Sequence, residues 1–103
     1  MKYITLICAA GMSTSLLVSK MKEVAKNEGK DVQIVAMSSS VFANYKEPTD
    51  VLLLGPQVSY LLDEMKNKYE PKGMKVDVID MAAYGMMDGK KVLDAACAMM
   101  DEI

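Results

Sequence analysis

The sequence contains neither histidine nor arginine, and all twelve of its basic residues are lysines. These lysines form no block, and the formal net charge at pH 7 is −2, so the chain lacks the clustered positive charge on which nucleic-acid binding depends. Long apolar runs are also missing, because none approaches the ~18 residues that a membrane-spanning helix needs. With 51% apolar and 25% charged residues in 103, the chain has the composition of one ordinary globular domain spanning residues 1–103.

Cysteine is scarce, with only Cys8 and Cys97. The N-terminal apolar segment faintly resembles a lipoprotein export signal, but it is shorter than the roughly 7–15 residues of such a segment, and Ile7 is bulky where cleavage requires a small residue. We therefore expect a cytoplasmic chain whose thiols stay reduced, without a structural disulfide. Cys97 has helical spacing with Leu93, so we interpret it as a small core residue.

Short apolar runs alternate with segments of helical periodicity. Four buried strands are predicted, at residues 2–8, 32–37, 51–54 and 76–79. Helices are predicted from about Ser13 to Glu28, from Pro56 to about Tyr69 and from about Asp88 onward, with a short helical turn after residues 38–40. Gly29 is placed to end the first of these helices. The alternating order predicts an α/β fold, a parallel sheet with helices on both faces.

The carboxyl ends of parallel strands form the edge where such sheets bind ligands. Cys8 follows the first predicted strand, and Ser38, Gly55 and Asp80 follow the other three. The architecture therefore places one cysteine where chemistry is expected.

A run of small residues and hydroxyls follows Cys8, in the order Ala9, Ala10, Gly11, Met12, Ser13, Thr14 and Ser15. Small residues let successive backbone N–H groups turn inward around an anion, and the following helix directs its unpaired amides at the same place. The hydroxyls can cap the helix or donate to phosphate oxygens, and the same donors favour thiolate, the nucleophilic form of cysteine. We interpret the segment as a phosphate-binding loop with Cys8 as the phosphate carrier; the alternative is a buried strand-end cysteine before a capped helix.

Other phosphate-binding patterns fit this loop less well. The Walker pattern needs a lysine and a second glycine, and a dinucleotide fingerprint needs three glycines. The small tyrosine phosphatases carry a cysteine, five residues and then an arginine, but here Thr14 occupies the arginine position. Without that arginine the loop loses most of its stabilisation of the transferring phosphoryl group. Such a site is suited to holding a thiophosphate rather than hydrolysing it, as a carrier requires.

Four segments carry a family resemblance, namely CAAGMSTSLLVSKM, TDVLLLGPQVSYLL, VDVID and YGMMDG. Together they resemble the soluble IIB component of the sugar phosphotransferase system (PTS), in the lactose, cellobiose and N,N′-diacetylchitobiose family, and they cover nearly the whole chain in order. The resemblance implies a four-stranded parallel sheet in the order 2-1-3-4, similar to the low-molecular-weight tyrosine phosphatase fold.

The resemblance also implies a mechanism. Cys8 would take a phosphoryl group from a phosphohistidine on the IIA protein, held by the loop from Ala9 to Ser15, and pass it to a sugar bound in the membrane transporter IIC. The absence of histidine from the chain agrees with this role. The sugar expected is a β-linked disaccharide of the cellobiose or chitobiose type. A cytoplasmic phosphotransferase subunit of this kind visits the membrane only through IIC, needs no cofactor or metal, and shows no sign of an obligate dimer.

Three further residues are candidates near this site. Asp80 follows the fourth strand, where the phosphatase fold keeps its general acid, and the alternative is that it caps a turn. Gln57 lies on the same sheet edge and could steady the loop or contact a partner, or be an ordinary surface residue. Tyr84 could pack beside the loop, or belong to the core.

The sequence is rich in methionine, with eleven residues. Four of them, Met12, Met81, Met86 and Met87, fall near the proposed edge and suggest a pliable docking face for two dissimilar partners, although methionine also simply replaces leucine in packing. Two other functions remain open from sequence alone, a phosphatase-like phosphomonoesterase and a non-catalytic anion-binding or redox module.

Overall fold

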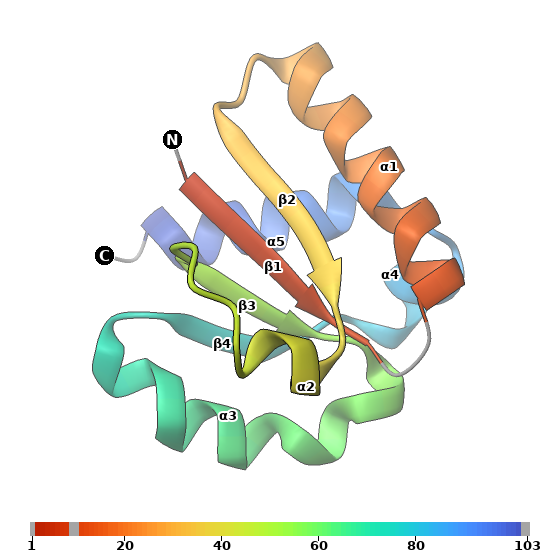
Figure 1. Cartoon of the computed structure of the whole chain (residues 1–103). Coiled ribbons are helices and arrows are strands. Elements are labelled where there is room, and N and C mark those ends of the chain that lie inside the picture. The colour runs from red at the N-terminus through yellow and green to blue at the C-terminus, as the bar shows by residue number, and fades with distance from the viewer. Residues whose placement is uncertain (1, 9–10, 102–103) are drawn as a thin grey trace.

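The computed structural model describes residues 2–8 and 11–101, and their side chains except those of residues 11–14 and 101. Its four strands are β1 (Lys2–Ile7), β2 (Val32–Met37), β3 (Val51–Leu54) and β4 (Lys75–Val78). They form one parallel sheet in the order β2-β1-β3-β4, which confirms the predicted architecture (Figure 1). The observed strands differ from the predicted ranges by no more than one residue at either end.

The helical elements fill the connections between strands. They are α1 (Gly11–Glu28), α2 (Ser39–Phe42), the 3-10 helix η1 (Pro56–Leu61), α3 (Leu62–Tyr69), the 3-10 turn η2 (Glu70–Lys72), α4 (Met81–Gly85) and α5 (Gly89–Asp101). Gly29, just after α1, has a φ of 68°, a left-handed conformation that glycine adopts without strain. Ser38 caps α2, because its hydroxyl accepts the Val41 N–H.

Three of these elements, η1, α3 and α4, differ most from the sequence-based prediction. The helix predicted over residues 56–69 is a 3-10 segment followed by an α-helix, because Val58 has non-helical angles (φ −117°, ψ 24°) that kink the chain. The short helix α4 was not predicted. Its five residues are too few to show a helical period in the sequence, and a carboxylate cap from Asp80 starts it.

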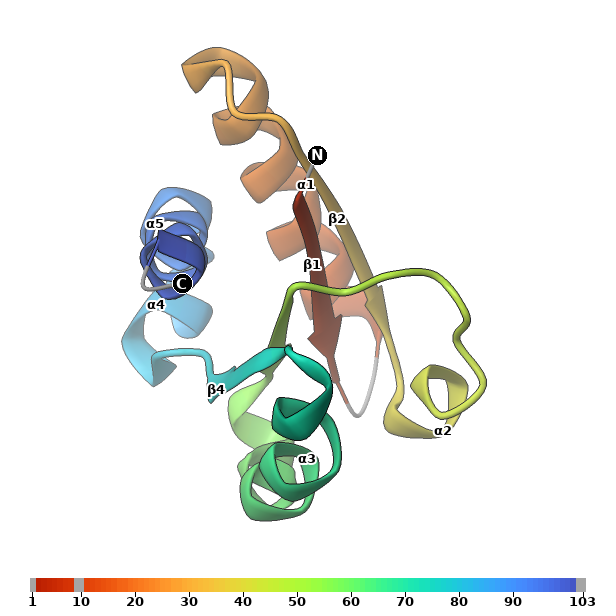
Figure 2. The ribbon, with the colours of Figure 1, turned by 90° about the vertical axis from the view of Figure 1, so that its left-hand side faces the viewer.

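Each face of the sheet is covered by its own helices, as Figure 2 shows for α1 and α5 on one side and α2 and α3 on the other. The larger core joins α1, α4 and α5 to the sheet and includes the fully buried side chains of Ile4, Leu6 and Leu93. The smaller core joins η1 and α3 to the opposite face around Ile7, Leu52 and Leu54. Inner strands β1 and β3 are therefore largely buried on both faces, as parallel strands between two helix layers are, and the buried Thr5 hydroxyl of β1 is hydrogen-bonded to Thr49.

The helices α1 and α5 are in direct contact at Gly89, the first residue of α5. A Cβ atom at this position would lie only 2.7 Å from the Lys20 carbonyl carbon and 2.8 Å from the Met21 nitrogen. Glycine is therefore required here by the close approach of α5 to the backbone of α1.

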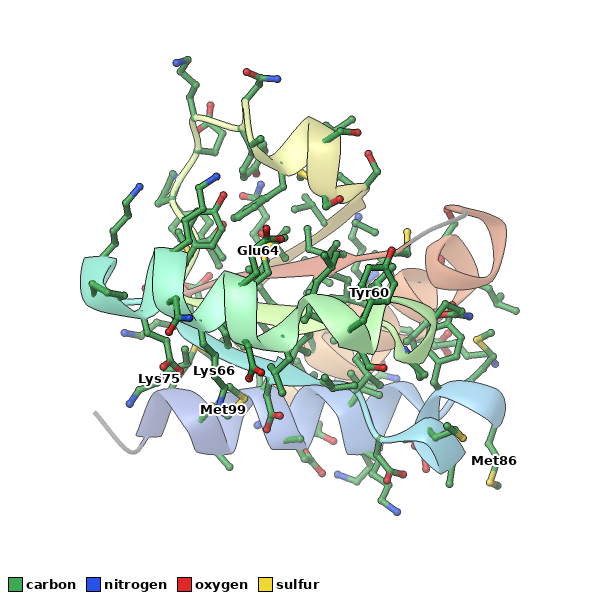
Figure 3. The ribbon with its side chains drawn as sticks, turned by 90° about the horizontal axis from the view of Figure 1, so that it is seen from below. Tyr60, Glu64, Lys66, Lys75, Met86 and Met99 are labelled. Atoms are coloured by element: carbon green, nitrogen blue, oxygen red, sulfur yellow. The ribbon has the colours of Figure 1, made fainter. Side chains whose placement is uncertain are left out.

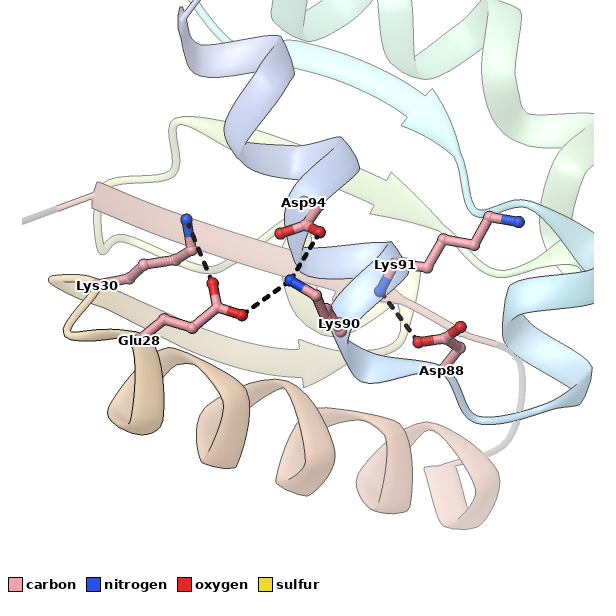
Figure 4. A network of polar contacts seen from close by, with 6 residues as sticks. All are labelled: Glu28, Lys30, Asp88, Lys90, Lys91 and Asp94. Carbon is pink, nitrogen blue, oxygen red and sulfur yellow. Dashed lines mark hydrogen bonds and ion pairs between the residues drawn. The ribbon is translucent and has the colours of Figure 1, made fainter.

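A polar network on the surface joins the same two helices (Figure 4). The Lys90 ammonium donates to Glu28 on α1 at 2.9 Å and to Asp94 on α5 at 3.3 Å, and Lys30 lies 3.7 Å from Glu28. The hydrogen bond to Glu28, followed by that to Asp94, raises the pKa of Lys90 above its ordinary value of 10.5. The network is solvent-exposed, so it adds little to stability compared with the apolar contacts beneath it.

Candidate functional site

The four strands end level with one another at the carboxyl edge of the sheet. Ile7 is in register with both Met37 and Leu54, and Leu54 is in register with Val78. The residues that follow these four positions consequently lie along one edge, where ligands bind in parallel α/β sheets. Cys8 follows β1, an inner strand, so the predicted position of this cysteine is confirmed.

The side chain of Cys8 is almost buried, with 6% of its surface exposed. The Cys8 backbone N–H donates to the Met37 carbonyl at 3.1 Å, which extends the β1–β2 ladder by one bond. The Cys8 thiol also points to this carbonyl, with 3.9 Å between sulfur and oxygen. Cys8 and Cys97 are not joined in a disulfide, and Cys97 is half-buried against the larger core, as predicted.

The helix α1 begins at Gly11, three residues after Cys8 and two residues earlier than predicted. Ser13, Thr14 and Ser15 therefore lie inside the first turns of α1, whereas the sequence analysis placed Ser13 at the boundary of the helix. Serine and threonine residues in a row offer several possible caps, and sequence alone cannot choose among them. Ser15 is exposed on the helix.

Several of the predicted loop residues lie outside the described part of the structure. These are Ala9 and Ala10 in full, and the side chains of Met12, Ser13 and Thr14. The predicted phosphate-binding role of the loop therefore stays a prediction.

Gln57 and Tyr84 meet at Gly55, next to the end of β1. The Gly55 N–H donates to the Ile7 carbonyl at 2.8 Å, which fixes Gly55 beside the residue that precedes Cys8. A Cβ atom on Gly55 would lie 2.9 Å from the Gln57 side-chain oxygen and 3.9 Å from Cε2 of Tyr84. Both side chains therefore lie against this glycine. Gln57 is exposed, and Tyr84 is buried in the larger core, which is the core position considered for it. Its predicted packing beside the loop stays a prediction.

Asp80 is the N-cap of α4, because its carboxylate accepts the Ala83 N–H at 3.0 Å. Its backbone carbonyl accepts the Tyr84 N–H at 2.9 Å, so Asp80 holds the helical turn that presents Tyr84. The capping alternative considered for Asp80 is thus what the contacts describe.

Exposed apolar side chains occur on the elements that directly follow the four strands. Five large ones are more than half exposed, namely Leu16, Val41, Tyr60, Met81 and Met86. The first four lie in α1, α2, η1 and α4, and Met86 is the C-cap residue of α4. Figure 3 shows Tyr60 and Met86 projecting from different elements. We call these five residues the apolar ring.

The sequence analysis found only part of the apolar ring. Met81 and Met86 belong to it as suggested, whereas Met87 is half-buried, packs against the larger core and has a φ of 54°. Leu16, Val41 and Tyr60 were missed. The exposure of Leu16 could have been predicted, because this residue lies outside the periodic apolar positions that α1 buries. Val41 and Tyr60 lie in helices too short to show such a period.

The described residues lack the features of two other kinds of site. Among residues 2–8 and 11–101, no cluster of three or more cysteine, aspartate or glutamate side chains is arranged to hold a metal ion. In the same ranges, no helix combines the length and apolar character needed to span a bilayer.

Comparison with known proteins gives one consistent result. A family model described as "PTS system, Lactose/Cellobiose specific IIB subunit" matches residues 3–95. A cellobiose-specific EIIB component from Lactococcus lactis subsp. lactis (strain IL1403) and a galactose-specific EIIB component from Lactococcus lactis subsp. cremoris (strain MG1363) are each 51% identical over 105 residues, with 97% of both chains covered.

A solved structure agrees with these relatives. The solution structure of a cellobiose-specific phosphotransferase IIB component from Borrelia burgdorferi has a TM-score of 0.80 and 33% sequence identity, covering 98% of this chain and 93% of that one. The level strand ends, the cysteine after β1 and these matches lead to one assignment: the chain belongs to the lactose/cellobiose-specific family of phosphotransferase-system IIB subunits.

Proposed function

We propose that this chain is a phosphocarrier whose Cys8 accepts a phosphoryl group from a phosphohistidine of a IIA protein and donates it to a sugar held by a membrane IIC protein. The position of Cys8 at the carboxyl end of an inner strand, in a chain of the IIB family, carries the proposal. The chain would act on the cytoplasmic side of the membrane, meeting IIC only during transfer.

The first step is an in-line displacement at phosphorus. The Cys8 thiolate forms the S–P bond while the P–N bond to the IIA imidazole breaks, and the ring leaves neutral because its other nitrogen already carries a proton. In the second step a sugar hydroxyl attacks phosphorus and gives its proton to a base of IIC or to water, the S–P bond breaks, and the thiolate is regenerated. Backbone amides at the start of α1 and the hydroxyls of Ser13–Ser15 are proposed to hold the phosphoryl oxygens.

The residue types that the chain lacks support a carrier. The chain has no arginine to stabilise the equatorial oxygens of the transferring phosphoryl group and no histidine to activate water. An S-phosphoryl group would therefore persist long enough to be passed on.

We propose Gln57 and Tyr84 as positioning residues for this site. Both lie against Gly55, whose N–H donates to the Ile7 carbonyl, so their side chains lie near the end of the strand that Cys8 follows. Asp80 contributes by starting the helix that carries Tyr84.

The apolar ring is proposed as the docking surface for IIA and IIC. Because Cys8 is only 6% exposed, a donor phosphohistidine must be brought close to the sheet edge, and an apolar surface around that edge favours such an approach. Replacing Tyr60 and Met86 by alanine should weaken IIA binding measured by calorimetry, whereas replacing the exposed Lys46 by alanine should not. Unchanged affinity of the double variant would contradict the docking role.

For the sugar, we propose a β-linked disaccharide of the cellobiose or chitobiose type. Relatives named for cellobiose and for galactose are equally similar to this chain, at 51% identity each. Similar IIB chains therefore serve different sugars, which supports sugar selection by IIC.

A transfer assay tests the proposal. The protein is incubated with radiolabelled phosphoenolpyruvate, the general PTS proteins and IIA, and the label on this chain is measured after electrophoresis. We expect labelling of the parent and of the matched control Cys97→Ser, and none of Cys8→Ser. Absence of label from the parent would instead support a non-catalytic anion-binding module.

A second assay separates the carrier from a phosphatase. Hydrolysis of p-nitrophenyl phosphate by the parent should not exceed that by Cys8→Ser. Turnover well above this control would overturn the carrier and favour a phosphomonoesterase.

A further inference from the structure

The strand β2 lies at one edge of the sheet, and in the described part of the chain it pairs with β1 alone (Figure 1). The Lys2 N–H donates to the Asp31 carbonyl and the Cys8 N–H donates to the Met37 carbonyl. Because peptide groups alternate in direction along a strand, residues 31, 33, 35 and 37 bond to β1. The N–H and C=O groups of Val32, Ile34 and Ala36 therefore point away from the sheet, toward a vacant strand position.

The outward edge of β2 carries none of the usual features that prevent pairing with another chain. Its six residues, VQIVAM, include no charge, proline or glycine. The opposite edge, β4, has four residues, two of which are the charged Lys75 and Asp77. There the Asp77 carboxylate accepts the Val78 N–H at 2.8 Å, which occupies an outward-facing donor. One edge of this sheet is thus blocked and the other is open.

A groove follows the open edge between β2 and α1. Two open hollows, of about 330 and 370 Å³, share Lys22 and Ile34 among their lining residues and so lie next to each other along β2. The first is lined on its helix side by Lys22 and Lys26, together with Lys30 just after α1, and the second by Ser15 and Ser19. A strand that paired with the free edge of β2 would therefore lie in this groove, next to the lysine side chains of α1.

The positive charge of the groove indicates which kind of partner it binds. Within the described residues, Lys22 and Lys26 are exposed and make no ion pair. Lys30 does make one, with 3.7 Å between its Nζ and Oε1 of Glu28. Antiparallel pairing with a second copy about the centre of β2 would bring Lys22 of both copies together, because Lys22 lines the groove beside Ile34. Like charges so placed oppose self-pairing and favour a partner with carboxylates.

We propose that the free edge of β2 binds an extended segment of a partner protein that carries acidic side chains at alternate positions, which joins the sheet as a fifth strand. Main-chain hydrogen bonds to Val32, Ile34 and Ala36 give the segment its register. Alternate side chains face α1, and carboxylates there meet Lys22 and Lys26. This surface does not depend on the chemistry proposed for Cys8.

Peptide titration of the ¹⁵N-labelled protein tests the proposal, with the seven-residue probe TEVETEV, blocked at both ends. We expect amide shifts and slowed hydrogen exchange centred on Val32, Ile34 and Ala36. The matched probe TKVKTKV should bind at least about tenfold more weakly, because its charges repel the lysines. Equal binding of the two probes, or shifts centred on another element, would overturn the proposal.

Two variants separate the edge from general electrostatics. The double variant Lys22→Glu, Lys26→Glu changes exposed side chains, so it should fold and lose binding of TEVETEV, while Lys46→Glu, Lys91→Glu carries the same charge change elsewhere and should retain it. Retained binding in the first variant would contradict the proposal.

Sedimentation of the parent without peptide tests whether a second copy occupies the edge instead. A dimer whose stability changes in the Lys22→Glu, Lys26→Glu variant would overturn the proposal of an acidic partner and favour a second copy.

Discussion

Substitution of Gly89 by alanine tests whether the close contact between α1 and α5 sets the position of the last helix. The alanine Cβ would lie below 3.0 Å from three atoms of Lys20 and Met21, two of which belong to the α1 backbone. A backbone atom cannot move aside as a side-chain tip can, so α5 must shift away from α1.

The expected cost follows from two opposing effects. Overpacking of a close contact destabilises a protein by about 1–3 kcal/mol. Replacing glycine by alanine also reduces the entropy of the unfolded chain, which stabilises the fold by about 0.4–1 kcal/mol. The net loss expected for Gly89→Ala is therefore about 1–2 kcal/mol, or a decrease of roughly 5–10 °C in Tm for a domain of this size.

Urea unfolding followed by circular dichroism measures this loss, and Gly85→Ala is the matched control. A Cβ at Gly85 meets no atom within 4 Å, and its φ is not positive. The control should therefore be neutral or slightly stabilised. If Gly89→Ala were as stable as Gly85→Ala, the argument from the α1–α5 contact would be refuted.

The remaining predictions concern the core, a cap and the surface network. Leu93→Ala removes a side chain with 0% exposure and should cost about 2–5 kcal/mol in urea unfolding, whereas Leu16→Ala, at 51% exposure, should stay within about 0.5 kcal/mol. Asp80→Ala should cost about 1 kcal/mol through loss of the α4 cap, while Asp80→Asn keeps both the cap and phosphoryl transfer; loss of transfer in Asp80→Asn would instead indicate a proton-donating role. Lys90→Gln should lower Tm slightly at neutral pH. Because the pKa of Lys90 is raised in the fold, this difference is present below pH 10.5 and disappears as the pH rises through the raised value, as melts between pH 7 and 11 would reveal.

The strands were predictable because each is a short apolar run between polar or glycine-containing segments. The run VLLL before Gly55 and Pro56, for example, is buried at all four positions. Sheet order followed from the family resemblance, since alternation of strands and helices fixes a parallel sheet but leaves the order of its strands open.

The arrangement of the residues at the sheet edge was less predictable than the residues that lie there. Gln57 and Tyr84 are distant in sequence, and their meeting at Gly55 depends on how η1 and α4 leave the sheet. The start of α1 differed because helix boundaries depend on which of several polar residues caps the first turn. The apolar ring was only partly visible because it is assembled from four separate elements, each contributing one or two residues.

The carbonyl of Met37 accepts both the backbone N–H and the thiol of Cys8. The backbone bond is the last hydrogen bond between β1 and β2. Because β1 pairs with both β2 and β3, it cannot shift along its axis without breaking the hydrogen bonds to both neighbours. Cys8 consequently follows a strand that is hydrogen-bonded on both sides. For the carrier role proposed for Cys8, we expect the position of its backbone to stay the same with each partner, so that adjustment between partners comes from the partner or from the surrounding helices.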